Sequence, residues 1–184
     1  DTMRAIKGAG LIAGLFGLMS VFARTLGGVF ADRCGEKWGL SGRIKCLFVV
    51  LFCEGLSLML FSRMNVLMTA IPAVMLFSLF VKMAQGATFS VVPFINKHAL
   101  GSVAGIVGAG GNVGAVAAGF LFKAEAISWP TALFVLGAFV TCCSFLSFAV
   151  SFSEEAETEA RFATQNALGE RRRTVKLAGA EVIG

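Results

Sequence analysis

Residues 8–35 read GAGLIAGLFGLMSVFARTLGGVFADRCG, a long apolar run that nevertheless contains charged residues. A run of this length can cross a membrane as one helix, because a span needs about 20 predominantly apolar residues. Arg24 lies deep inside it, where a charged side chain costs ~2.5–3.5 kcal/mol or more on insertion scales. Arginine cannot lose its proton to avoid that cost. We therefore expect Arg24 to face a polar cavity or a bound anion; a purely structural arginine, ion-paired or reaching the membrane surface, is the alternative.

Composition places the whole chain among integral membrane proteins. Of the 184 residues, 57% are hydrophobic and only 15% are charged, and the mean hydropathy is +0.81. An ordinary soluble domain has about 25% charged residues. The formal charge of +5 does not indicate a nucleic-acid partner, because the basic residues lie mainly between and beyond the apolar runs. That placement is typical of the cytoplasmic surface of a lipid bilayer.

The sequence favours a transport or binding function over catalysis. It shows no nucleophile–base constellation, metal-ligand cluster or phosphate-binding loop, so we expect neither an enzyme nor a metal or cofactor. The five cysteines have no metal-ligand spacing and are interpreted as small hydrophobic residues without a disulfide. Because the chain begins with Asp1 and reaches an apolar run by Gly8, we also expect it to be a fragment of a longer protein.

Five apolar segments predict an all-α membrane protein with five spans. They cover residues 8–31, 46–61, 66–92, 101–122 and 131–152, so residues 1–152 are interpreted as one membrane domain. A basic turn is expected between the first two spans. Pro130 suits the first turn of the last helix, where a missing N–H does little harm.

The basic residues of the connecting segments predict the orientation of the spans. One side of the membrane holds the larger group and is expected to be cytoplasmic: Arg33, Lys37, Arg43, Lys45, Lys97 and Arg161. The other side holds the smaller group: Arg4, Lys7, Arg63 and Lys123. The polar tail, residues 153–184, then lies in the cytoplasm. Its length and polarity favour a largely disordered segment, with a short surface helix as the alternative.

The fourth span is unusually rich in glycine, with seven between residues 101 and 119. Glycine four residues apart gives a smooth helix face for close packing, although each glycine weakens a helix by about 1 kcal/mol relative to alanine. Asn112 lies beside Gly110 and Gly111 and can both donate and accept hydrogen bonds. These residues are candidates for contact with a small solute, or for packing in which Asn112 bonds a neighbouring backbone.

Two stretches and a loop motif resemble the nitrate/nitrite porter family of the major facilitator superfamily. GGVFADRCG, residues 27–35, resembles the superfamily's G-x-x-x-D-R-x-G loop motif. AQGATFSVVPF (84–94) and GIVGAGGNVGAV (105–116) are similar to segments of the porter family, the second to its glycine-rich nitrate signature. FARTLGG (22–28) resembles the segment where that family has a substrate-binding arginine. The residues of these motifs are most similar to those of the eukaryotic high-affinity branch of the family.

The resemblance implies a facilitator fold in which these spans are helices 8–12 of twelve, and a secondary active transporter of nitrate, with nitrite a further substrate. It implies that Arg24 binds the anion, that transport is by alternating access coupled to protons, and that a small accessory membrane protein is a potential partner. The plasma membrane is the expected location. The motif residues are assigned to gating: Gly27, Gly28, Asp32, Arg33 and Gly35. Keeping a basic loop in the cytoplasm is the alternative role for Asp32 and Arg33.

Other interpretations stay open at the level of sequence. A facilitator of another small anion or an organic solute is one, and a nitrate sensor that does not transport is another. Glu54 and Lys82 lie inside the second and third spans, where each can be a proton relay or an ion-paired helix contact. We interpret Glu54 as structural and leave the role of Lys82 open. Phe89 and Phe94 are weaker candidates for the wall of an anion site.

Overall fold

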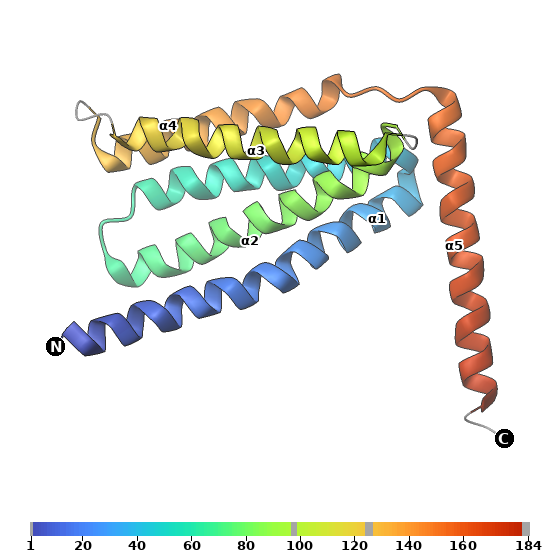
Figure 1. Ribbon diagram of the computed structural model, residues 1–184, viewed down its shortest axis with the longest axis horizontal. Coiled ribbons are helices and arrows are strands. Elements are labelled where there is room, and N and C mark those ends of the chain that lie inside the picture. Colours follow the sequence, from blue (N-terminus) through green and yellow to red (C-terminus); the bar gives the residue numbers. More distant parts are fainter. Residues whose placement is uncertain (1, 97–98, 124–126, 182–184) are drawn as a thin grey trace.

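The computed structural model describes residues 2–96, 99–123 and 127–181, and every regular element within these residues is helical. Figure 1 shows the long helices lying side by side, with the last helix set across one end of the bundle. Four segments of the described chain are long and apolar enough to cross a membrane: Ser20–Ser62, Leu67–Phe94, Leu100–Lys123 and Trp129–Ala149. The predicted all-α membrane protein is confirmed, whereas the facilitator-superfamily fold stays a prediction.

Helix α1, Thr2–Ser62, supplies two of the five predicted spans because it is bent back on itself at Gly39. Gly39 has φ 67° and ψ −154°, a conformation essentially confined to glycine, so the chain reverses direction at a single residue. The predicted basic turn over residues 32–45 is therefore far shorter in the structure: helix continues through Lys37 and resumes directly after Gly39. The intervening Glu, Lys and Arg residues are good helix formers, which explains why helix continues.

The remaining apolar helices lie close to their predicted ranges. They are α2 (Leu67–Val91) with the 3₁₀ turn η1 (Val92–Phe94), α3 (Leu100–Lys123), and α4 (Trp129–Ser144) with the 3₁₀ segment η2 (Phe145–Ala149). Pro130 lies in the first turn of α4, as predicted. Figure 1 shows the α1 bend, the α2–α3 connection and the start of α5 at one end of the bundle. These are the segments that carry the basic residues of the predicted cytoplasmic side. Lys97, one of these basic residues, lies outside the described residues.

The polar tail contains a long helix, α5 (Glu154–Glu181), rather than only a short one. Three glutamates in its first turn interact favourably with the positive end of the helix dipole. The Ser153 hydroxyl also accepts a hydrogen bond from the Ala156 N–H at 3.3 Å. Both features favour a helix beginning at this point. That the tail is largely disordered stays a prediction.

The core lies between the two halves of α1 and α2. Ala31, Cys46, Val50, Ala84 and Ala87 form a buried cluster at this junction. Small side chains allow the three helical segments to approach closely, which fixes the first half of α1 against α2.

Candidate functional site: a groove between α1 and α2

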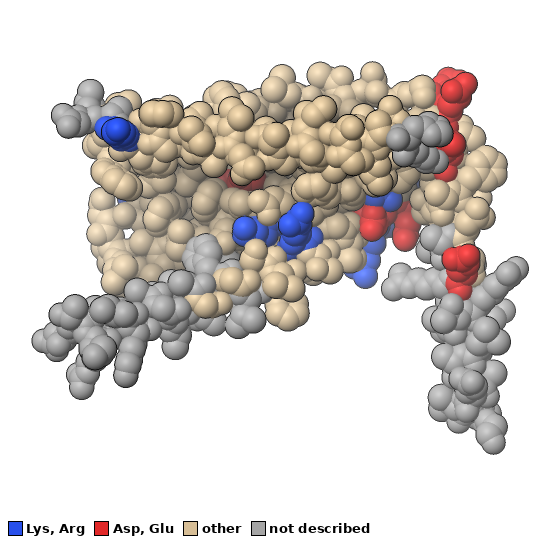
Figure 2. All heavy atoms as spheres, viewed as in Figure 1, with Lys and Arg blue, Asp and Glu red and all other residues tan. Residues whose placement is uncertain are grey.

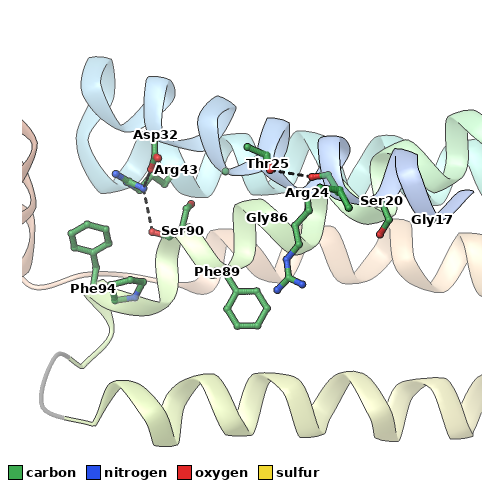
Figure 3. Close-up of a pocket in the computed structure, with 13 residues that line it drawn as sticks. Gly17, Ser20, Arg24, Thr25, Asp32, Arg43, Gly86, Phe89, Ser90 and Phe94 are labelled. Carbon is green, nitrogen blue, oxygen red and sulfur yellow. Dashed lines mark hydrogen bonds and ion pairs between the residues drawn. The ribbon is translucent and has the colours of Figure 1, made fainter. Parts of the chain in front are cut away.

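A groove of about 960 Å³ lies along the contact of α1 and α2 (Figure 3). Its walls come from residues 17–32 of α1 and 86–90 of α2, from the turn η1, and from Arg43 beyond the α1 bend. Apolar and glycine residues form most of the surface, and Arg24, Asp32 and Arg43 are its charged residues. An apolar cavity with a few convergent polar groups is the usual form of a small-ligand site.

Arg24 extends from α1 into the groove. Figure 3 shows its guanidinium pointing away from the helix contact, toward the side on which α3 runs, and beside the ring of Phe89. The guanidinium carbon lies 5.0 Å from the centroid of that ring, a cation–π geometry. No carboxylate among the described residues forms an ion pair with Arg24. Within the described chain, its donors are therefore open to an anion in the groove.

Two glycines bring α2 against the Arg24 turn of α1. A Cβ atom added at Gly86 would overlap the carbonyl oxygen of Arg24, and one added at Gly27 would overlap the backbone of Met83. Only glycine permits backbones to approach this closely. The contact holds Phe89, one turn further along α2, at its cation–π distance from Arg24.

The other end of the groove contains a neutralised charge pair. Arg43, 9% exposed, forms an ion pair with Asp32 and donates a hydrogen bond from Nη1 to the Ser90 carbonyl oxygen at 3.2 Å. The Arg43 guanidinium carbon also lies 4.9 Å from the Phe94 ring centroid. A Cβ at Gly35 would come within 2.7 Å of the Arg43 Nε, so glycine there leaves room for the arginine. This cluster joins both halves of α1 to α2 and η1.

The predicted site residues fall into two groups. Asp32, Gly27, Gly28 and Gly35 lie at or beside the α1–α2 contact, whereas Arg33 is exposed and lines no part of the groove. The α3 candidates lie elsewhere: Gly110, Gly111 and Asn112 are exposed and are absent from the groove lining. A Cβ added at either of these glycines would meet nothing within 4 Å among the described residues. Their substrate-binding role stays a prediction.

Sequence reasoning missed two parts of this site. In the sequence, Arg43 is one of several basic residues in an expected turn, and its pairing with Asp32 follows only from the reversal at Gly39. Gly86 belongs to the AQGATF motif, but the motif alone does not indicate that it packs against α1. The sequence does contain a signal for this contact. FARTLGG and AQGATF lie on two different apolar spans, and both motifs contain glycine, which allows helices to pack closely.

Comparison with known proteins identifies similar chains among membrane transporters. High affinity nitrate transporter 2.5 of Arabidopsis thaliana is 38% identical over 140 residues, covering 76% of this chain and 28% of that protein. Nitrate transporter 2.1 of Chlamydomonas reinhardtii is 34% identical over 133 residues, covering 72% of this chain and 24% of that protein. The nitrate/nitrite transporter NrtP of Nostoc punctiforme is 30% identical over 166 residues, covering 83% of this chain and 31% of that protein. The chain thus spans less than a third of the length of these relatives. No protein-family profile matches it, and no solved structure does.

Proposed function

Since this chain belongs to the nitrate/nitrite porter family, we propose that it forms part of a membrane transporter for nitrate, in which Arg24 contacts the anion. The observation behind the proposal is the state of Arg24: a permanently charged guanidinium faces an apolar groove without a carboxylate partner in the described chain. Asp32, the carboxylate of the groove, is already paired with Arg43. An anion is the ligand that would satisfy this charge.

Nitrate fits the chemistry of that guanidinium. It is a planar monoanion with three acceptor oxygens, and a planar guanidinium can offer it two parallel charge-assisted hydrogen bonds. The ring of Phe89 lies over one side of the Arg24 guanidinium, 5.0 Å from its carbon, and is a flat surface against which a planar anion can lie. Nitrite, also small and planar, is a second substrate under the same proposal.

The finer steps of transport extend this proposal. The complete protein would work by alternating access, exposing one site near the bilayer midplane to each side in turn. Protons would supply the driving force by symport, and a small accessory membrane protein would assist. The Asp32–Arg43 cluster, which links four segments at one end of the groove, would hold one conformation until the halves of the transporter rock. The plasma membrane is the proposed location, with α5 in the cytoplasm.

The test is uptake of labelled nitrate by the complete protein that contains this chain, in cells lacking their own nitrate carrier, with an accessory protein co-expressed. Arg24→Lys keeps the positive charge but removes the planar pair of N–H donors. We therefore expect uptake to fall by about tenfold or more at equal surface expression. Arg63→Lys is the matched control, because Arg63 also lies over an aromatic ring, that of Phe134 at 5.0 Å, but outside the groove. It should transport normally.

Each outcome bears on a different part of the proposal. Saturable uptake that Arg24→Lys removes and Arg63→Lys retains supports both the substrate and the site. Uptake that both variants retain removes Arg24 from the site and leaves nitrate transport standing. A wild type that does not take up nitrate, even with the accessory protein present, contradicts the proposed substrate.

A further inference from the structure

A second cation lies inside a membrane-spanning helix of this chain. Lys82 belongs to α2, within the otherwise apolar stretch FSLFVKMAQGATF at residues 77–89. Its residue is partly buried, and no ion pair or hydrogen bond joins its ammonium group to another residue of the described chain. A lysine in a membrane span without a partner is costly, so a ligand is expected to compensate its charge.

Lys82 is not among the residues that line the groove, but the helical register places it on the groove side of α2, one turn before the first α2 residue of the lining. Gly86 and Phe89, both in the groove lining, follow it by four and seven residues. At about 3.6 residues per turn, positions i, i+4 and i+7 share one face of a helix. Lys82 therefore lies one turn before Gly86, about 6 Å along the helix axis at a rise of 1.5 Å per residue. The following residue, Met83, contacts Gly27 of α1, which fixes this turn of α2 beside the Arg24 segment.

Neither Arg24 nor Lys82 forms an ion pair with a carboxylate of the described chain. Figure 2 shows basic side chains midway along the molecule, with an acidic side chain partly visible beside them in this view. Asp32 is taken up by Arg43. Two cations on adjacent packed helices repel each other, and a monoanion between them would add two attractions over shorter distances that outweigh this repulsion.

We propose that Lys82 is a second anion-holding residue of the groove and sets the affinity of the site for nitrate. This inference rests on the proposed transport of nitrate. Lysine offers a compact charge without a fixed fork of donors, so it attracts an anion without orienting it. Arg24 would orient the anion and Lys82 would raise its occupancy. Removing the lysine charge should therefore raise KM more than it lowers the maximal rate.

The experiment measures the concentration dependence of nitrate uptake by the complete transporter, corrected for the amount at the cell surface. Lys82→Gln should raise KM by about fivefold or more, since it removes one of two nearby positive charges. Lys82→Arg keeps the charge and should stay near the wild-type KM. Lys123→Gln, the same change at the exposed end of α3 and outside the groove, is the control and should behave as the wild type.

The pattern across variants separates an electrostatic role from a structural one. A raised KM in Lys82→Gln that Lys82→Arg restores supports the inference, because a packing defect would depend on shape and would lower the maximal rate. A wild-type KM in Lys82→Gln, within a transporter that does take up nitrate, overturns this inference alone. An equal rise in KM for both Lys82 variants also overturns it. A wild type without nitrate uptake overturns the proposed function and this inference together.

Discussion

Arg24 and Arg43 show two ways of placing an arginine in an apolar helix. Arg43 is buried and satisfied, with Asp32 as its counter-ion, the Ser90 carbonyl as an acceptor and the Phe94 ring against its guanidinium. Arg24 is exposed to the groove, and among the described residues its guanidinium contacts the face of the Phe89 ring and forms no ion pair. The first arrangement stabilises the protein without a ligand. The second leaves donors open, which is the property a binding residue needs.

The Asp32–Arg43 pair gives a prediction at this scale. Asp32→Asn would leave the buried Arg43 charge without its counter-ion, which we expect to cost about 1–3 kcal/mol of stability. The lower end applies because the Asp32 side chain is 55% exposed. Thermal unfolding of the complete protein in detergent measures the effect, and Asp32→Glu, which keeps the charge, is the control. Equal melting of Asp32→Asn and the wild type would show that the pair contributes little.

Much of this residue-level picture could be predicted from the sequence, but not its partnerships. The sequence alone indicates Arg24, because a charged side chain inside a membrane span is energetically costly and usually has a functional role. Its neighbour Phe89 and the Asp32–Arg43 pair depend on which helices lie in contact, and hydropathy does not determine that. Asn112 shows the same limit: its residue type suggested a site, but it is exposed on α3 and is not part of the groove lining, so its binding role stays a prediction.

At the scale of elements, the contact of α1 with α2 depends on Gly27 and Gly86. Gly86→Ala should force the helices apart, because the new Cβ would overlap the Arg24 carbonyl oxygen and neither backbone can move alone. We expect a loss of about 1–3 kcal/mol in stability, together with lower nitrate uptake as Arg24 shifts. Thermal unfolding and uptake of the complete protein measure both.

A matched glycine on α5 provides the control for that substitution. Gly169 has nothing within 4 Å of an added Cβ, so Gly169→Ala should leave uptake unchanged. If Gly86→Ala melted and transported as Gly169→Ala does, the close α1–α2 contact would not position Arg24.

The elements themselves were predicted well where hydropathy is decisive and less well where it is not. The ranges of α2, α3 and α4 follow from their apolar runs and from Pro130 at the start of the last. The reversal at Gly39 did not follow, because a single glycine in a basic stretch is as compatible with a longer loop. α5 is helical although its apolar content is low, since helix propensity and the glutamates of its first turn favour a helix and Ala160 of α5 is buried.

At the scale of the whole molecule, the described helices enclose the Arg24 groove on one side, with walls from α1, α2 and η1. Other helix faces of the described chain are also open. α3 illustrates this: at each of its seven glycines an added Cβ would meet nothing within 4 Å among the described residues, and Asn112 is exposed among them. Glycine-rich faces in membranes usually meet another backbone. The curated relatives are more than three times as long as the matched region, so the rest of such a protein has ample length to supply that backbone.

This arrangement predicts that the chain alone does not transport. Alternating access needs a site that closes on each side in turn, and within the described chain the Arg24 groove has walls from α1, α2 and η1 only. Purified chain in lipid vesicles should therefore give no nitrate flux above that of protein-free vesicles, whereas the complete protein in the same vesicles should give saturable flux. An anion held by Arg24 and Lys82 on one wall would exchange with the nearer solution and never reach the other side. Saturable flux through the chain alone would contradict this, and would mean that these helices assemble with further copies of themselves to enclose the groove.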